Sequence, residues 1–174
     1  MSRQPRRDAD IVDHVERRRA QWRSELPDVD TRGMAVLGRL RWITLKIRPE
    51  IEAVFAKHGI DTGGFDVLST LLRSGPPYCL RPTELFRWLM VSSGGITQCL
   101  TRLQKMGLIE RSRSEGDGRS LPVQLTAKGR RRAAAAFRED MTVEAKILEV
   151  LDDQEQVQLG SLLAKLAASL NDES

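Results

Sequence analysis

The sequence has few of the residues that mark secreted or metal-binding proteins. Its 174 residues include 2 cysteines, 2 histidines and 5% aromatic residues. Cys79 and Cys99 are too few for a disulfide framework, and they cannot build the four-ligand thiolate or imidazole sites of structural zinc. We therefore expect no metal and no other cofactor.

Long hydrophobic runs are also absent. The longest, such as Leu68 to Leu72, are a handful of residues interrupted by Ser, Thr or Arg. A membrane-spanning helix needs roughly 20 apolar residues. Residues 1–13 contain arginines with no apolar stretch after them, so the sequence predicts no secretory signal. We expect a cytoplasmic protein without a membrane segment.

The short motifs of common enzyme classes are missing as well. There is no Gly-x-Ser-x-Gly, no Gly-x-x-x-x-Gly-Lys, no His-Glu-x-x-His and no Gly-x-Gly-x-x-Gly after a strand. We therefore expect no enzymatic activity. With 40% hydrophobic and 30% charged residues, the chain can bury the core of one compact domain, alone or with helical appendages.

Positive charge is concentrated in one part of the chain. Residues 92–132 hold nine Lys or Arg against three Asp or Glu, a net charge of +6. Residues 133–174 hold three Lys or Arg against nine Asp or Glu, a net charge of −6. A localised basic segment suggests a polyanionic partner such as DNA. The alternative is an ordinary solvated run of charges.

Apolar residues recur at helical spacing over most of the chain, which predicts a mainly α-helical fold. Pro27 ends the first helix. Gly59 suits the left-handed position after the second, and Asp61 or Thr62 can cap the third. Outside the region described next, the predicted helices are residues 8–26, 34–59, 62–73, 133–151 and 153–170.

Two helices of a helix-turn-helix are predicted between residues 82 and 106. The first runs from Pro82 to Leu89, and Ser92 can cap the second. A helical wheel puts Ile96, Leu100 and Leu103 on the inner face of the second helix. A far face without a carboxylate is typical of a helix in a DNA major groove, and the alternative is a plain solvent face. That far face holds Gly94, Gln98, Thr101, Arg102 and Lys105.

A basic β-hairpin follows, with predicted strands at residues 108–113 and 120–125 around a glycine-rich tip. Pro122 cannot donate to a strand ladder, so we expect the second strand at the edge of the sheet. Arg119 at the tip is placed to enter a narrow DNA minor groove, or alternatively it pairs with Asp117. A helix-turn-helix followed by such a hairpin is a winged helix.

These motifs resemble the MarR family of winged-helix transcriptional regulators over about residues 33–170. The resemblance implies a homodimer that represses transcription from a pseudo-palindromic operator. The matching segments are His58-Gly59-Ile60, Phe65-Asp66-Val67-Leu68, Pro82-Thr83-Glu84-Leu85, residues 92–97, Leu103, Gly107-Leu108-Ile109-Glu110-Arg111, Asp117-Gly118-Arg119 and Leu125-Thr126-Ala127-Lys128-Gly129.

The resemblance also divides the chain by role. Residues 1–32 would form an N-terminal extension helix and connector, residues 33–60 and 133–174 the dimerisation helices, and residues 61–132 the DNA-binding domain. The residues expected to contact DNA are Ser92, Ser93, Gly94, Thr97, Gln98, Thr101, Arg102, Lys105, Arg113 and Arg119.

The extra N-terminal helix makes the sequence most similar to the urate-responsive, PecS-type (UrtR) subgroup. In that subgroup a Trp, an Asp and an Arg line an effector pocket, and the matching positions are Trp22, Asp66 and Arg111. The resemblance therefore implies a small anionic or aromatic effector. The subgroup has an Arg in the recognition helix where this sequence has Cys99, so we expect weak or absent release by urate.

Several alternatives stay open. Trp22 would otherwise be a core anchor, Asp66 a buried partner of Arg111, and Arg111 a phosphate contact. A redox-responsive regulator would use Cys99 or Cys79, which requires an exposed thiol of low pKa. A winged helix that binds only proteins is the third alternative. The sequence favours a ligand-responsive, DNA-binding repressor over these alternatives.

Overall fold

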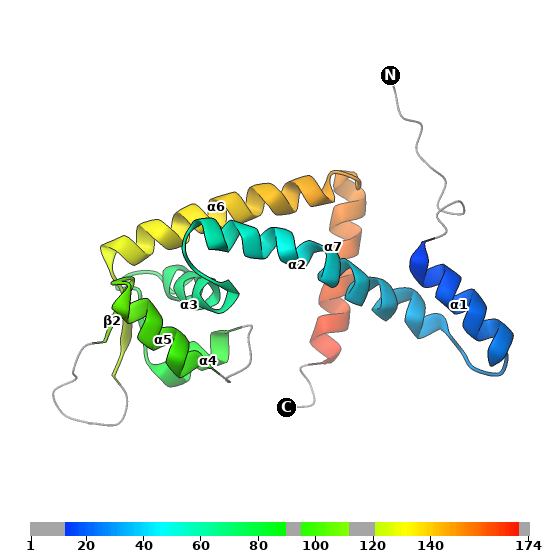
Figure 1. The fold of residues 1–174 in the computed structure, drawn as a ribbon, viewed down its shortest axis with the longest axis horizontal. Coiled ribbons are helices and arrows are strands. Elements are labelled where there is room, and N and C mark those ends of the chain that lie inside the picture. The colour runs from blue at the N-terminus through cyan, green and yellow to red at the C-terminus, as the bar shows by residue number, and fades with distance from the viewer. Residues whose placement is uncertain (1–12, 90–94, 112–120, 171–174) are drawn as a thin grey trace, which may run out of the picture. The chain divides into compact units, whose positions relative to one another are not determined.

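The computed structural model describes residues 13–89, 95–111 and 121–170, which form helices and one small antiparallel sheet (Figure 1). The predicted mainly α-helical class is confirmed. The chain divides into two compact units, residues 1–50 and 51–174. No helix within the described ranges is long and apolar enough to cross a membrane.

Unit 1 contains the N-terminal helices. Asp13 caps the first of them, because its Oδ1 accepts hydrogen bonds from two backbone amides of the first turn at 2.9 and 2.8 Å. Its Oδ2 accepts from Nε of Arg39 at 2.6 Å. The first helix ends beside Pro27, as predicted. The helical segments that begin in this unit are α1 (His14–Glu25), the π-helix η2 (Met34–Gly38) and α2 (Arg39–Lys57), whose last turns belong to unit 2.

Three helices of unit 2 surround most of its core. They are α3 (Thr62–Arg73), α4 (Pro82–Trp88) and α5 (Ile96–Lys105). Gly59, at φ +67°, follows the end of α2, and Asp61 caps α3 by accepting a hydrogen bond from the amide of Gly64 at 2.8 Å. Both predictions are confirmed.

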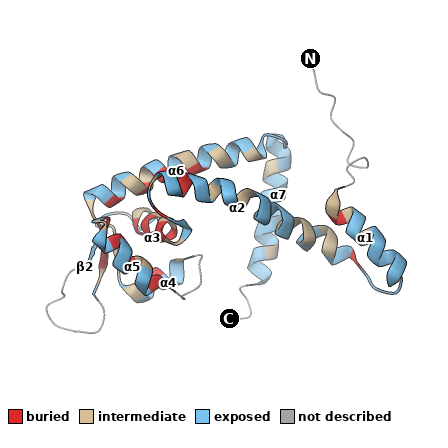
Figure 2. Ribbon diagram, viewed as in Figure 1, coloured by how far each residue is buried: buried red, intermediate tan, exposed pale blue. Residues whose placement is uncertain are grey.

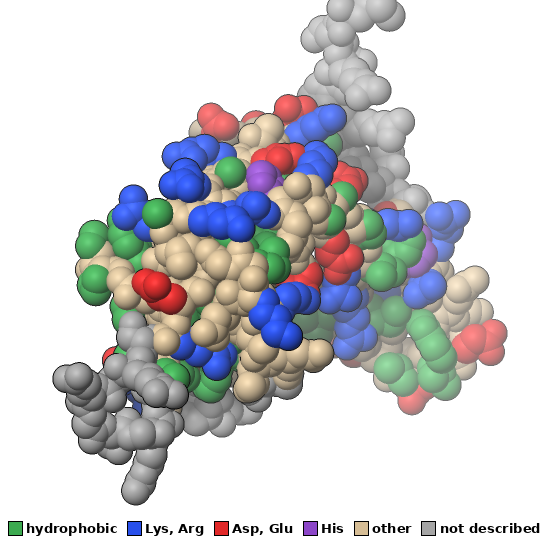
Figure 3. All heavy atoms as spheres, turned by 60° about the vertical axis from the view of Figure 1, so that its left-hand side comes forward, with side chains coloured by type: hydrophobic (Ala, Val, Ile, Leu, Met, Phe, Trp, Pro, Cys, Tyr) green, Lys and Arg blue, Asp and Glu red, His purple; other side chains and the backbone are tan. Residues whose placement is uncertain are grey.

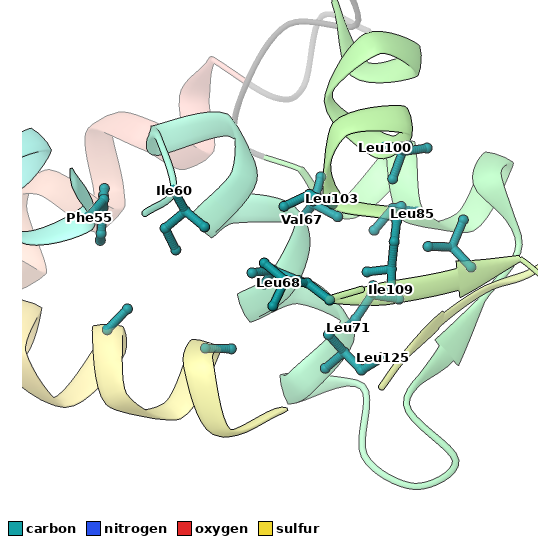
Figure 4. Close-up of a cluster of buried hydrophobic side chains, with 14 of the residues drawn as sticks. Phe55, Ile60, Val67, Leu68, Leu71, Leu85, Leu100, Leu103, Ile109 and Leu125 are labelled. Carbon is teal, nitrogen blue, oxygen red and sulfur yellow. The ribbon is translucent and has the colours of Figure 1, made fainter. Parts of the chain in front are cut away.

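The core joins these helices to the sheet. Leu68 and Leu71 of α3, Leu103 of α5 and Ile109 of the sheet are buried and converge in one cluster (Figure 4). Buried residues lie on α3 and on the sides of α5 and α6 that face it (Figure 2). Burying each large apolar side chain stabilises the fold by about 1.5 to 3 kcal/mol, so this cluster fixes the position of α5.

Three short strands form the sheet, in the order β1–β3–β2. They are β1 (Cys79–Leu80), β2 (Ile109–Arg111) and β3 (Val123–Leu125). The prediction that the second hairpin strand lies at the edge is wrong, because β3 pairs with both neighbours. Pro122 precedes the first paired residue, so its missing N–H removes no ladder hydrogen bond.

Two helices complete unit 2: α6 (Ala127–Leu148) and α7 (Asp153–Ser169). The predicted start of α6 at residue 133 is wrong. Thr126 caps the helix by accepting a hydrogen bond from the amide of Gly129 at 2.9 Å, so the basic residues 128–132 form its first turns. Helix α6 packs on α3, whereas no residue of α7 is buried within the chain.

Candidate DNA-binding surface and ligand cavity

Helix α5 has one buried and one exposed face, as the helical wheel predicted. Ile96, Leu100 and Leu103 are buried. The opposite side is free of acidic residues, because α5 contains no Asp or Glu. The exposed residues of α5 are Thr97, Gln98, Thr101, Arg102, Gln104 and Lys105.

The start of α5 differs from the sequence-based prediction. Its N-cap is Gly95, not Ser92, and the helix begins at Ile96. Gly95 has a φ of +90°, a left-handed conformation that favours glycine, so the helix cannot extend back through this residue. Five of the expected DNA contacts lie outside the described residues: Ser92, Ser93, Gly94, Arg113 and Arg119.

The centre of the exposed face is available to a partner. Neither Gln98 nor Lys105 makes a hydrogen bond or ion pair with any described residue. Thr101 donates its hydroxyl proton to the carbonyl of Thr97 at 2.9 Å, which leaves the hydroxyl oxygen as an acceptor. Amide, hydroxyl and ammonium groups on one face suit hydrogen bonds to base edges and phosphates.

Arg102 already has a partner within the chain. Its Nη2 lies 2.5 Å from Oδ1 of Asp61, the residue that caps α3. Burial alone would raise the pKa of Asp61, but hydrogen bonds from Arg102 and the Gly64 amide lower it below its ordinary value. The ion pair thus ties α5 to the beginning of α3.

A groove of about 560 Å³ lies along this ion pair, between the start of α3 and α5. Gln98, Thr101 and Lys105 line it together with Arg102. Figure 3 turns this side of unit 2 toward the viewer and shows Lys and Arg side chains at several points of the surface. The groove itself is lined by two basic side chains, Arg102 and Lys105, and by one acidic side chain, Asp61.

Most of the basic side chains in the first turns of α6 make contacts within the chain. Lys128 donates to the carbonyl of Met106 at 2.8 Å, and Arg132 donates to the carbonyl of His58. The guanidinium of Arg130 lies 4.7 Å from the centre of the Tyr78 ring. Helix α5, rather than α6, is therefore the better candidate for reading DNA.

The three residues expected at an effector site fall in both units. Trp22 lies in α1 of unit 1 and is 50% exposed, so it is not a buried anchor within the chain. Asp66 of α3 is 8% exposed and lines a cavity in unit 2. Arg111 of β2 does not line that cavity, and its Nε is buried without an acceptor among the described residues.

The cavity that contains Asp66 has a volume of about 350 Å³ and lies between α3 and α6. Its most buried member from α6 is Asp140, which is 5% exposed. Burial raises the pKa of Asp140, and the neighbouring carboxylate of Glu144 raises it further. The lining residues are Phe65, Asp66, Ser69, Leu72, Arg73, Phe137, Asp140 and Met141.

Comparison with known proteins decides the family. A sequence model of the MarR family matches residues 58–120. The chain is 35% identical to the transcriptional regulator PecS of Dickeya dadantii, over 86% of this chain and 90% of that relative. The chain belongs to the MarR family. MarR-family proteins are DNA-binding transcriptional regulators rather than enzymes, and the likeness to PecS agrees with the PecS-type subgroup inferred from the sequence.

Solved MarR-type structures have the same fold. A mutant of E. coli MarR in complex with operator DNA matches with a TM-score of 0.65 at 24% identity, covering 83% of this chain and 96% of that one. NadR in complex with 4-hydroxyphenylacetate matches with a TM-score of 0.60 at 23% identity, covering 80% and 96%. These likenesses confirm the predicted winged-helix fold.

The cysteines of this MarR-family chain do not have the properties of redox sensors. Both are free thiols in the structure. Burial raises the pKa of the Cys99 thiol, and it also raises the pKa of Cys79, to which the charge of Glu84 contributes. A sensing thiol needs a lowered pKa. These pKa directions weigh against the redox alternative.

Two features of the site were missed by sequence reasoning. The Asp61–Arg102 ion pair joins residues 41 positions apart, and no local pattern marks it. Asp140 did leave a signal, because it continues the buried stripe of Gly129, Ala133 and Ala136 at helical spacing. No group of three or more metal-ligating side chains lies together in the described ranges.

Proposed function

We propose that the chain represses transcription as a homodimer that places α5 of each protomer in the major groove of a pseudo-palindromic operator. One observation carries the proposal: Gln98, Thr101 and Lys105 face away from the core that fixes α5. Their amide, hydroxyl and ammonium groups suit base edges and phosphates. The match to MarR bound to operator DNA supports this docking.

The roles of the segments follow from the same proposal. We assign residues 61–132 to DNA binding, residues 33–60 and 133–174 to dimerisation, and residues 1–32 to an N-terminal extension. Exposed apolar side chains on α7 support the dimer, since Val157 is 70% exposed and Leu162 is 59% exposed. A contiguous apolar surface of this kind marks a protein interface, and a second protomer would cover it.

We also propose that a small aromatic effector releases the operator. The aromatic walls of the cavity between α3 and α6, from Phe65 and Phe137, support such a ligand. The phenolic ligand of NadR supports a ligand response in this fold. Asp66 lines the cavity, whereas neither Trp22 nor Arg111 does, so only the resemblance supports these two residues as effector contacts. Since Cys99 replaces an Arg of the subgroup, we expect micromolar urate not to release DNA in a gel shift.

Selecting the DNA bound by the purified protein, followed by gel shifts at physiological salt, tests the proposal. Gln98→Ala should change affinity by about 1 to 3 kcal/mol at particular bases, because a side chain that reads a base edge discriminates by that amount. Gln104→Ala is the matched control: the same substitution at another exposed position on the flank of α5. It should leave the selected sequence unchanged.

The same experiment distinguishes the proposed DNA-binding function from a winged helix that binds only proteins. A winged helix used only for protein contacts would select no DNA and would give no shift at physiological salt. That result would contradict the proposed function. Equal changes for Gln98→Ala and Gln104→Ala would instead contradict the assignment of α5 as the reading helix.

A further inference from the structure

The cavity between α3 and α6 contains a buried carboxylate without a partner. Oδ1 of Asp140 is inaccessible to solvent and accepts no hydrogen bond from any described residue. Buried polar atoms in native proteins are almost always paired, because leaving one unpaired costs as much as losing a hydrogen bond. An unpartnered carboxylate that lines a cavity therefore points to a hydrogen-bond donor that enters the cavity.

A second acidic residue lines the same cavity from the opposite helix. Asp66 of α3 is as deeply buried as Asp140 of α6. Among the residues that line the cavity, Arg73 carries the only positive charge. Its Nη2 donates to Oγ1 of Thr70 at 2.9 Å and to the carbonyl of Trp88 at 2.7 Å, so this nitrogen is not available to Asp140. The unpartnered carboxylate oxygen of Asp140 favours a cation and disfavours an anion.

The remaining walls are apolar. Phe65 and Leu72 line the cavity from α3, and Phe137 and Met141 line it from α6 with partly exposed side chains. Phe65 is held by stacking on Phe55, with ring centres 4.1 Å apart. Aromatic and thioether side chains pack well against a flat ring. A volume of about 350 Å³ is at the small end of ligand sites, enough for one ring with a short substituent.

We propose that this cavity binds a small aromatic cation, an amine or amidine whose N–H groups donate to Asp140 and whose ring lies between Phe65 and Phe137. The proposal rests on the ligand response proposed above and defines its ligand class. It replaces the anionic alternative with a cationic one. Asp140 becomes the residue that determines specificity for a cation.

The position of the cavity gives the ligand a route to the DNA-binding surface. Its wall is α3, and the residue that caps this helix, Asp61, holds Arg102 of α5. A ligand wedged between α3 and α6 is thus one helix away from the DNA-reading face. If ligand binding displaces α3, the Asp61–Arg102 ion pair would transmit that movement to α5.

Isothermal titration of the full-length protein with benzamidine, a planar aromatic cation, tests the proposal directly. Benzoate, of the same size and opposite charge, is the control ligand. Benzamidine should bind at least about tenfold more tightly than benzoate, since a charge-assisted hydrogen bond is worth at least that factor. Equal affinities, or tighter binding of benzoate, would overturn the proposal.

Two variants locate the site. Asp140→Asn should weaken benzamidine binding at least about tenfold, because it removes the charge and keeps the shape. Glu144→Gln removes a charge from the next turn of α6 but does not line the cavity, so its effect should stay under about twofold. Similar effects of both variants would mean that overall charge, not this cavity, attracts the cation.

Thermal unfolding by circular dichroism checks the variants and provides a second readout. Benzamidine should raise the melting temperature of the wild-type protein and of Glu144→Gln, but not that of a folded Asp140→Asn. Gel shifts without ligand test the DNA-binding function independently of the proposed ligand class. Operator binding without benzamidine binding would overturn only the ligand class, whereas benzamidine binding without DNA binding would overturn the proposed function.

Discussion

At the scale of single residues, an ion pair between Arg102 and Asp61 restrains α5, the proposed recognition helix. Arg102 is an expected DNA contact, but in the free protein its guanidinium is 2.5 Å from Asp61. An exposed ion pair of this kind contributes at most about 1 kcal/mol to stability. A DNA phosphate can therefore compete for Arg102, and Asp61 opposes that contact.

Asp61→Asn tests this competition. Asn also caps helices well, so α3 should keep its start while Arg102 loses a charged partner. We expect tighter binding to DNA of unrelated sequence, and a slope of log K against log salt that is steeper by about 0.9 for one more phosphate contact. Fluorescence anisotropy over a salt series measures both. In an Arg102→Ala background the substitution should have no effect, and an unchanged slope in the wild-type background would show that Arg102 does not bind phosphate.

The buried carboxylate of Asp140 predicts a pH-dependent gain in stability. Asp140→Asn should raise the free energy of unfolding at pH 7 by about 1 to 2 kcal/mol, because a buried, unpaired charge is removed. The fold raises the pKa of Asp140 above its ordinary value of 3.8. The cost of the charge is thus fully present above the folded-state pKa and vanishes below 3.8.

Urea unfolding at fixed protein concentration measures this gain. Its size should shrink as the pH falls from 7 toward 3.8. Glu144→Gln, an exposed carboxylate on the same helix, should change stability by no more than about 0.5 kcal/mol. A loss of stability in Asp140→Asn at pH 7 would show that the carboxylate has a favourable partner.

At the scale of elements, α6 is anchored where it crosses the loop before β2. A Cβ placed on Gly129 would lie 1.9 Å from the carbonyl oxygen of Leu108, which belongs to the backbone. Backbone atoms cannot yield as a flexible side chain does, so this helix start requires glycine. The glycine therefore allows the first turn of α6, which Thr126 caps, to pack against the backbone of Leu108.

Gly129→Ala should therefore destabilise the protein by about 1 to 3 kcal/mol, the usual cost of overpacking. Chemical unfolding monitored by circular dichroism gives the value. Gly33→Ala is the matched control, because its φ of −57° is helical and a Cβ there meets nothing within 4 Å. It should change stability by no more than about 0.5 kcal/mol. Equal stability of the two variants would contradict the proposed anchor.

Strong local signals explain which elements were predicted from the sequence. Asp61 caps α3 and Asp152 caps α7, and each precedes a run of apolar residues at helical spacing. The buried stripe of α5 needed only Ile96, Leu100 and Leu103 to define its exposed face. In each case, the capping residue and the spacing of the apolar residues belong to a single helix, so both can be identified from the sequence alone.

The missed features depend on contacts between elements. The two residues of β1 are too few to show a strand pattern, so the central position of β3 was not foreseen. The contact between Gly129 and Leu108 joins two elements, so no local pattern marked residues 127–132 as the first turns of α6. The cavity and the partner of Arg102 likewise arise only when α3 meets α5 and α6.

At the scale of the whole molecule, the proposed function requires two protomers. One α5 reads only a short half-site, and a pseudo-palindromic operator needs a second copy about one helical turn away. The exposed apolar residues of α7 give the chain a surface for that assembly. Dimerisation therefore has to set the distance between the two α5 helices so that it matches the distance between the two half-sites of the operator.

Hydroxyl-radical footprinting on the selected operator tests this claim most directly. We predict two protected blocks on one side of the duplex, centred about 34 to 36 Å apart, as expected for two recognition helices in successive major grooves. Gln98→Ala should change the preferred bases at equivalent positions of both blocks, while Gln104→Ala should not. A single block, protected by a species that sediments as a monomer, would contradict the account.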